Sequence, residues 1–336
     1  MLPKVYWNDC VVKKCGEMNN GGIERISQFD YPLLCAPIPV PKVWAGDRLC
    51  RLRGWPEKVG ESWEVSTWPT APDNEQLHTV SYIVNGPLAG VPLDQVTTMP
   101  VVAKVIDSAA PLSVQCHPHQ SDEHKNEMWY LFEAAPDAYL YVGFADGVTA
   151  EHFCVLLHDT PPDEGKIIGA LQRRDHVKRG MHFRVPAPTV HALGPGLLTF
   201  EISERTQVTY RLFDYNRARS RGQLEIVEGC HALQTAIEPP PVLQPLFDID
   251  VPSENIAAFS TFCVWIVRGE RIVIHSASHQ HLVTASTGPC RLSGLTPEWA
   301  VTLGYTQTCL VPPIDREYTI DMQGSGEVLI SPLAGY

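Results

Sequence analysis

Prolines and glycines divide this chain into short apolar runs, and this division limits the folds that it can adopt. The 336 residues include 29 prolines and 24 glycines, which favour turns and interrupt helices. Runs such as 127–134, 138–144, 197–203 and 207–215 are rich in β-branched and aromatic residues. Short strands at regular spacing are typical of a β-sandwich or a jelly roll. We therefore predict a mainly β protein.

Helical periodicity is concentrated in one stretch of the chain. Residues 149–159 carry apolar side chains at helical spacing. Residues 163–174 open with acidic residues and close with basic ones, which matches the helix dipole. These patterns predict a small helical insertion at about 149–175 within a β domain.

The length of the chain indicates more than one domain. Residues 1–30 show no strong period, and we predict that they form an N-terminal extension. The proline-rich segment 237–246 is a predicted linker. It would separate a catalytic β domain at 31–236 from a C-terminal β domain at 247–336 that is expected to hold no metal.

Charge and cysteine usage exclude several classes of protein. The net charge of −12 disfavours nucleic acid or an anionic membrane as a partner. The sequence contains no apolar run of transmembrane length, and its first residues lack the core of a signal peptide. The ten cysteines are scattered without a CxxC pair, which favours reduced, mostly buried thiols. We therefore expect a cytoplasmic protein.

Five residues with metal-ligand chemistry lie in two short segments. Because strand side chains alternate between two faces, Gln115, His117 and His119 would share one face. Glu127 follows at the start of the next apolar run, and His191 follows a proline-framed turn. A single histidine in a strand is more often a hydrogen-bonded structural residue than a ligand. The combination of amide, imidazole and carboxylate groups nevertheless favours a divalent metal such as zinc.

The segment before His191 sharpens the predicted architecture. Gly180, Pro186, Pro188 and His191 are similar to the second motif of the cupins, GxxxxxPxGxxH, with Pro188 in the glycine position. Such a motif is a tight turn leading into a strand that carries a metal-binding histidine into a barrel. The resemblance implies two cupin-type jelly-roll barrels in tandem.

A longer series of motifs resembles the type I mannose-6-phosphate isomerases (phosphomannose isomerases), especially their short bacterial form. The motifs follow the order of the family over roughly residues 35–336, which makes the signal specific. They are VWAGDRL at 43–49, VGESWEVS at 59–66, PVVAKVIDSAAPLSVQCHP at 100–118, HKNEMWY at 124–130, VPAPTVHALGPG at 185–196 and VTYRLFDYNR at 208–217.

The resemblance assigns four side chains as ligands of one zinc ion per chain, or of another divalent metal. They are Gln115, His117, Glu127 and His191. An ordinary cupin would use both histidines of an HxH pair, but the family has Gln-x-His followed by proline, as at Pro118. Since proline ends the pairing of a strand, we expect His119 at the mouth of the pocket rather than among the ligands.

The activity implied by the resemblance is the interconversion of mannose 6-phosphate and fructose 6-phosphate. A proton moves between C1 and C2 through an enediol, which requires a base and a group that stabilises the developing oxyanion. Arg211 and Lys125 match the active-site arginine and lysine of the family and are predicted to be catalytic. Lys104, Ser113 and His119 are predicted to bind the hexose 6-phosphate substrate. The chain is expected to be a monomer or a homodimer.

One residue departs from the pattern of the family. Family members usually have an acidic residue four positions before the arginine, whereas this chain has Gln207. A glutamine cannot ionise and cannot act as a base. The alternative prediction is therefore a sugar-phosphate-binding cupin with altered or lost isomerase activity, acting as a sensor or interaction protein. The four ligands, together with Lys104, Lys125 and Arg211, favour the enzyme.

The sequence does not assign a catalytic role to several other polar residues. Glu64 and Glu201 either orient metal ligands or are buried structural carboxylates. In the C-terminal domain, His275, His279 and His281 have strand parity but no matching carboxylate. We predict that they bind no metal and that they lie on the surface or are bonded locally.

Overall fold

The fold was analysed in a computed structural model. It describes residues 29–71, 74–119, 124–206, 208–215, 217, 224–235, 247–249, 251–277, 279–294, 299–313 and 315–334. Within these residues strands dominate, which confirms the predicted mainly β class. Helices in the described part of the chain all lack the length and apolar character that crossing a bilayer requires. They are α1 (Arg48–Arg53), α2 (Ala150–Leu157), α3 (Glu164–Gly169), α4 (Ile226–Gln234) and the 3₁₀ helix η1 (Leu93–Gln95).

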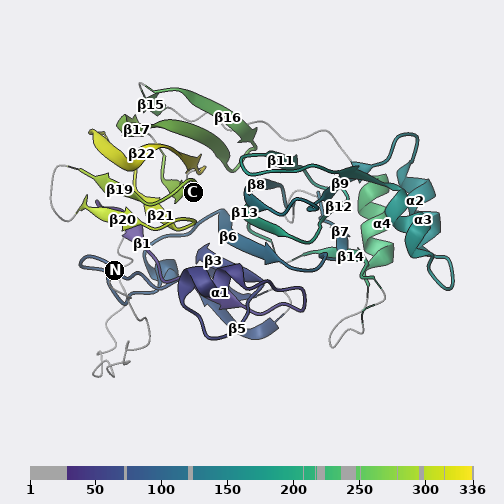
Figure 1. Ribbon diagram of the computed structural model, residues 1–336. Helices are drawn as coiled ribbons and strands as arrows, with labels where there is room; N and C mark the ends of the chain where they lie inside the picture. Colours follow the sequence, from purple (N-terminus) through teal and green to yellow (C-terminus); the bar gives the residue numbers. More distant parts are fainter. Residues whose placement is uncertain are drawn as a thin grey trace.

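Two antiparallel sheets form the barrel in the middle of the molecule (Figure 1). Sheet I has the order β10 (Leu171–Arg174), β9 (Leu140–Phe144), β12 (His191–Leu193), β7 (Val114–Cys116) and β14 (Tyr210–Phe213). Sheet II has the order β11 (His182–Val185), β8 (Glu127–Ala134), β13 (Leu197–Glu204), β6 (Val101–Ser108), β3 (Glu61–Val65) and β2 (Ile38–Val40). A separate hairpin is formed by β4 (Thr67–Ala71) and β5 (Asn74–Val80).

The C-terminal part of the chain forms a further antiparallel sheet, sheet III. Its main path runs through β1 (Leu33–Leu34), β21 (Thr308–Val311), β18 (His281–Ala285), β22 (Tyr318–Pro332), β17 (Cys263–Ala277) and β15 (Phe247–Ile249). Three strands branch from it: β16 (Ser253–Ala258), β19 (Cys290–Ser293) and β20 (Val301–Leu303). Strand β1 belongs to the N-terminal part of the sequence, so this part of the chain contributes a strand to sheet III.

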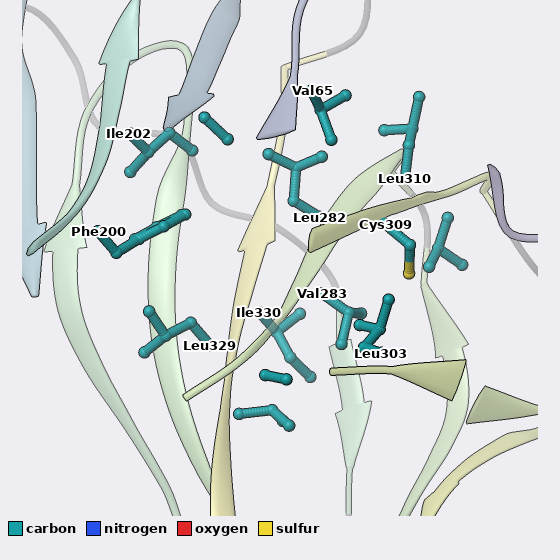
Figure 2. Close-up of a cluster of buried hydrophobic side chains, with 14 of the residues drawn as sticks. Val65, Phe200, Ile202, Leu282, Val283, Leu303, Cys309, Leu310, Leu329 and Ile330 are labelled. Atoms are coloured by element: carbon teal, nitrogen blue, oxygen red, sulfur yellow. The ribbon is translucent and has the colours of Figure 1, made fainter. Parts of the chain in front are cut away.

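Sheet II is buried on both faces because its apolar residues occupy both parities. On β13, Leu198, Phe200 and Ile202 belong to the core shared with sheet III, while Leu197 packs in the barrel with residues of sheet I. Figure 2 shows Phe200 and Ile202 beside side chains from sheet III, including Ile330. Each buried aliphatic or aromatic side chain contributes about 1.5–3 kcal/mol of transfer free energy. These contacts therefore hold sheet II between sheet I and sheet III.

Helices α2 and α3 lie between β9 and β10, inside the predicted insertion. Thr149 caps α2 by accepting a hydrogen bond from the His152 N–H at 3.2 Å, and Asp163 caps α3. The last part of the predicted insertion, Leu171–Arg174, is strand β10, because it pairs with β9 along the edge of sheet I. The predicted helical pattern therefore ends earlier than the sequence suggested.

Helix α4 packs on the outer side of sheet I. A Cβ atom on Gly229 would lie 2.4 Å from Leu212 Cδ2 and 3.1 Å from Tyr210 Cβ, so a larger residue here would require these side chains to move. The side chain of Cys116 also contacts this turn of the helix, with Sγ 3.6 Å from the Gly229 oxygen. The helix thus supports β7 and β14 from behind.

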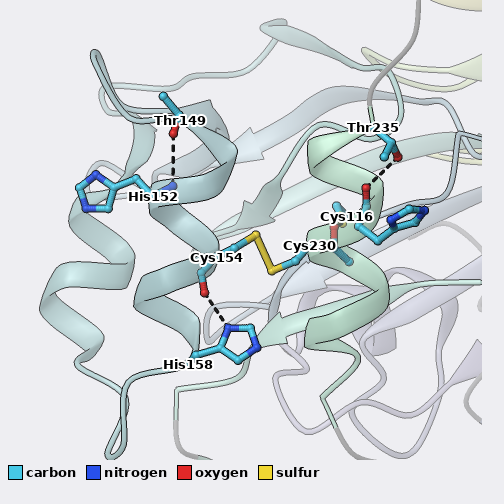
Figure 3. Close-up of a disulfide and its surroundings, with 9 residues drawn as sticks. Cys116, Thr149, His152, Cys154, His158, Cys230 and Thr235 are labelled. Carbon is cyan, nitrogen blue, oxygen red and sulfur yellow. Dashed lines mark hydrogen bonds between the residues drawn. A yellow bond between two sulfur atoms is a disulfide. The ribbon is translucent and has the colours of Figure 1, made fainter.

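A disulfide between Cys154 and Cys230 joins α2 to α4 (Figure 3). The expectation that all the cysteines are reduced is therefore wrong for this pair. The sequence separation is 76 residues, and the fold brings the two Cα atoms within 5.7 Å, a distance that a disulfide spans. The other cysteines of the described residues are free thiols, and most of them are buried.

The predicted domain boundaries stay predictions. Of the N-terminal extension at 1–30, only the last two residues are among those that the structure describes, and the linker at 237–246 lies outside them. The arrangement of the C-terminal sheet as a second barrel in tandem is likewise a prediction.

Candidate metal centre

Sheet I places three of the predicted site residues in one row. The Cα partner of Gln115 is His191 on one side and Arg211 on the other. Residues that pair directly in antiparallel strands carry their side chains on the same face. His117 lies two residues after Gln115 and shares that face by parity.

Sheet II supplies the carboxylate from the opposite wall of the barrel. Glu127 begins β8, and Trp129 lies two residues further along the same strand. The Trp129 ring meets the His191 ring edge to face, with the two centroids 5.3 Å apart. This contact across the barrel places Glu127 opposite the histidines of sheet I.

Three ligand-type side chains converge at this point. Ligand atoms of His117, Glu127 and His191 all lie within 4.8 Å of one another, the only such group of acidic, histidine or cysteine residues within the described ranges. His117 Nε2 lies 2.9 Å from Glu127 Oε1, and His191 Nε2 lies 3.7 Å from Glu127 Oε2. The structure therefore brings together three of the four ligands that the sequence predicts.

The fourth predicted ligand, Gln115, borders the same group. Its amide Nε2 lies 3.2 Å from His191 Nε2. Because half a turn of the amide exchanges its nitrogen and oxygen, Gln115 can present an oxygen to an ion at this position. The complete set then has two nitrogen and two oxygen donors, which suits zinc and related divalent metals.

Backbone carbonyls set the tautomers of both histidines. His191 Nδ1 lies 2.8 Å from the Thr189 oxygen, and His117 Nδ1 lies 3.2 Å from the Val208 oxygen. Since a carbonyl only accepts, each Nδ1 carries the proton and donates it. The lone pair of each Nε2 is left to face Glu127, as a metal ligand requires.

The protonation states of the imidazoles also favour metal binding. Burial and the nearby Lys125 ammonium lower the pKa of His117 to about 3. Burial also lowers the pKa of His191. Both rings are therefore neutral near pH 7, and a neutral imidazole needs no deprotonation before it binds an ion.

Glu127 is a buried carboxylate that needs a cation. Burial by itself would raise its pKa, but the Lys125 ammonium lowers it well below its ordinary value. Lys125 Nζ lies 2.7 Å from Glu127 Oε1. Neither Glu127 oxygen accepts a hydrogen bond of ordinary geometry from the described residues. Because a buried charge is costly unless it is paired and bonded, this carboxylate fits a divalent ion.

The other predicted site residues lie around this group. Lys125 Nζ is 3.4 Å from His117 Nε2, so it borders the centre directly. Arg211 is fixed through its backbone, because its N–H donates to Glu225 Oε2 at 3.0 Å. His119 Nε2 contacts the Thr235 hydroxyl at 3.2 Å, and Ser113 is buried just before β7. Lys125 thus borders the ligand group, Arg211 and Ser113 lie in or next to sheet I, and His119 contacts the residue that follows helix α4.

Lys104 is held by carboxylates of its own. Its Nζ lies 2.9 Å from Glu201 Oε1 and 3.9 Å from Glu61 Oε2. Burial alone would lower the pKa of Lys104, but Glu201 and Glu61 raise it, so the lysine is charged. Burial would raise the pKa of Glu61, yet Lys104 and Lys42 bring it down to about 2. Lys104 is therefore a buried ion-paired cation on the barrel wall.

Glu64 and Glu201 have different partners in the structure. Glu201 accepts a hydrogen bond from Trp129 Nε1 at 3.2 Å, in addition to its ion pair with Lys104. It thus positions residues that line the centre. Glu64 instead pairs with Arg53 at 2.8 Å, which makes it a structural carboxylate.

Two buried residues next to the centre were not predicted from the sequence. Asn126 belongs to the HKNEMWY motif, but no role was predicted for it. Glu204 is the last residue of β13 and lies outside all the recognised motifs. They bond to each other beside Lys125 and Glu127. Only the pairing of β13 with β8 reveals this proximity.

Two of the C-terminal histidines are bonded locally, as predicted, and the absence of metal from their domain stays a prediction. His281 is buried and bonded at both nitrogens, to the His279 oxygen at 3.1 Å and to the Tyr318 hydroxyl at 2.8 Å. His275 contacts Glu317 at 3.2 Å. Among the described residues, His281 is not part of the group of ligand-type side chains, which consists of His117, Glu127 and His191.

Comparison with known proteins agrees with the motifs. No family model matches the chain. A probable mannose-6-phosphate isomerase of Bacillus subtilis is 34% identical over 217 residues, which cover 57% of this chain and 64% of that protein. A second mannose-6-phosphate isomerase of the same organism is 30% identical over the same lengths. The chain thus matches somewhat less than two thirds of the length of these relatives.

Solved structures share the fold over nearly the whole chain. The mannose 6-phosphate isomerase of Bacillus subtilis superposes with a TM-score of 0.71 at 20% identity, covering 90% of this chain and 99% of that one. Phosphomannose isomerase of Salmonella typhimurium in its apo form superposes with a TM-score of 0.65 at 12% identity, covering 91% and 100%. The expected mainly β cupin fold is confirmed, and the chain is similar in sequence to mannose-6-phosphate isomerases over 57% of its length.

Proposed function

We propose that this protein is a zinc-dependent aldose–ketose isomerase that interconverts mannose 6-phosphate and fructose 6-phosphate. The names of its relatives support this proposal. The observation that carries it is the convergence of two neutral imidazoles and a buried carboxylate beside Lys125. Such a centre is suited to a reaction in which negative charge develops on sugar oxygens.

The residues around the centre have distinct proposed tasks. Gln115, His117, Glu127 and His191 would hold the divalent ion, which supplies Lewis acidity toward the sugar oxygens when bound. Lys125 Nζ lies 2.7 Å from Glu127 Oε1. It can donate a proton to a substrate oxygen and take the proton back later in the reaction. Arg211 would stabilise the enediolate with its fixed cationic fork.

Substrate binding is proposed for three further residues. Lys104 pairs with Glu201 on sheet II, Ser113 precedes β7 of sheet I, and His119 contacts Thr235 at the end of helix α4. Because Lys104 is already paired with Glu201, it adds less net positive charge than an unpaired lysine would. We therefore propose that it orients the substrate through hydrogen bonds, while Arg211 supplies much of the positive potential for the anionic substrate.

The remaining features are proposed from the chemistry of the substrate. We place the protein in the cytoplasm, because a charged hexose phosphate does not cross a lipid bilayer unaided. The chain is proposed to act as a monomer or a homodimer, without a nucleic-acid or membrane partner. The catalytic domain would be 31–236, with a metal-free C-terminal domain at 247–336.

The proposal is tested by assaying the purified protein with added zinc against a panel of hexose phosphates. We expect isomerisation of mannose 6-phosphate with exchange of the C2 proton into the solvent. A protein that binds zinc and the sugar phosphate without this exchange would instead be the sugar-phosphate-binding protein of the alternative prediction.

Gln207 is outside the described residues, and its effect is best tested by mutation. We expect Gln207→Asp to change kcat little, because Lys125 and His124 remain available near the centre to carry the proton. Initial rates with mannose 6-phosphate, compared with a Gln207→Ala control, measure the effect. An increase of about 10²–10⁴-fold, the range typical of a restored general base, would show that the acidic residue of the family is the missing proton carrier.

A further inference from the structure

Asn126 connects the strand of Glu127 with the turn that leads to His191. Its backbone N–H and its side-chain Nδ2 both donate to Glu204 Oε2, at 2.8 and 2.9 Å. Its Oδ1 accepts a hydrogen bond from the Ala187 N–H at 3.0 Å. One amide side chain therefore spans from the end of β13 to the proline turn before β12.

Glu204 is the other half of this connection. The backbone N–H of Glu204 donates to the backbone oxygen of Asn126 at 3.0 Å, so each residue donates a hydrogen bond to the other. Its second carboxylate oxygen accepts the Thr261 hydroxyl and lies 3.2 Å from His124 Nε2. The residue is only 3% exposed. A carboxylate is retained at such a position only when hydrogen bonds compensate for its burial.

The connection lies directly beside the metal centre. Lys125 and Glu127 flank Asn126 in sequence, and Glu127 pairs with Ser203, the neighbour of Glu204. A shift of Asn126 would therefore move the backbone of both flanking residues. It would also release Ala187, four residues before His191.

We propose that Glu204 is a positioning residue that acts through Asn126 to hold Lys125, Glu127 and the turn before His191 in the geometry that binds the metal. The inference rests on the proposed function, because it takes Glu127 and His191 to be metal ligands. Glu204 itself touches neither the ion nor the substrate. Through Thr261 it also ties the centre to the C-terminal half of the chain.

The test is the affinity of the metal-free protein for zinc, measured by competition with a chromophoric chelator. Glu204→Ala leaves two buried donors of Asn126 without an acceptor. We expect its zinc affinity to fall by about 10–100-fold, the usual cost of losing a group that orients metal ligands. Glu204→Gln keeps an oxygen acceptor for Asn126 and should restore most of the affinity.

Two control variants separate positioning from general stability. Glu64→Ala removes a carboxylate that is equally buried, 3% exposed, but paired with Arg53. It should lower the melting temperature and leave the zinc affinity unchanged. Thr261→Val removes the hydroxyl that donates to Glu204 Oε1 and leaves the Asn126 bonds to Oε2 intact. This variant should retain most of the zinc affinity.

Asn126→Ala covers the case in which Glu204→Ala does not fold. It removes the side-chain bond to Glu204 and the acceptor of the Ala187 N–H, while its backbone N–H can still donate to Glu204. We expect a similar loss of zinc affinity. A folded Glu204→Ala or Asn126→Ala protein with the zinc affinity of the wild type would overturn the inference.

The same titration separates this inference from the proposed function. If the wild type binds zinc without isomerising any sugar phosphate, the proposed activity fails, while a loss of affinity in Glu204→Ala still supports the positioning role. If the wild type binds no divalent metal, both are overturned.

Discussion

A His191→Ala variant loses stoichiometric metal binding. The substitution removes one of two neutral imidazoles whose Nε2 atoms face Glu127, and alanine supplies no donor in its place. The remaining side chains then form an incomplete set for zinc, which takes four ligands in its common sites. Metal content per chain after zinc loading and gel filtration measures the effect. The wild type should hold one ion.

The C-terminal half contains a closely matched control. His281 is buried like His191, and its Nδ1 bonds to the carbonyl two residues earlier, just as His191 does. Its Nε2, however, meets the Tyr318 hydroxyl instead of a carboxylate. His281→Ala should therefore retain one ion per chain. One tightly held ion in His191→Ala would refute the ligand assignment, and a second ion in the wild type would refute the metal-free C-terminal domain.

An Arg211→Ala variant keeps its metal and loses most of its turnover. Arg211 occupies the same row of sheet I as Gln115 and His191, so its side chain shares their face of the sheet. We propose that the guanidinium stabilises the enediolate, and loss of one such group typically lowers kcat by about 10²–10³-fold. Steady-state kinetics with mannose 6-phosphate, together with metal content, measure both parts of this prediction.

Arg268→Ala is the matched control for the arginine. Arg268 is ion-paired with Glu254 and Glu327 on sheet III and belongs to no part of the proposed site. Its kcat should equal that of the wild type. A rise in KM with unchanged kcat in Arg211→Ala would mean that Arg211 binds the substrate and its transition state equally. That result would remove it from the catalytic residues.

Alternating patterns made much of the barrel predictable. The apolar run 127–134 coincides with β8 (Glu127–Ala134), and 197–203 falls within β13 (Leu197–Glu204). The same period of two placed Gln115 and His117 on one face, and the structure confirms that both lie beside His191. Local patterns work here because the pleat of a strand assigns each side chain to a face without reference to the rest of the chain.

Short or shared elements were less predictable. Among the described residues of the run 207–215, the strand is limited to Tyr210–Phe213, and the run 163–174 divides into a helix and a strand. Helix α4 carries an internal glycine, which sequence propensity disfavours, yet Gly229 lies where the helix packs closely on Leu212 and Tyr210 of sheet I. Tertiary contacts override local preference in these places.

The sequence by itself determined the fold class, the ligand types and the order of the motifs, because these depend on residue identity and local period. Tertiary structure alone decided which distant residues meet. Examples are the disulfide between Cys154 and Cys230, the ion pair of Lys104 with Glu201, and the bonds between Asn126 and Glu204. Each depends on strand pairing or helix packing across many residues of chain, and no local pattern in the sequence encodes that pairing.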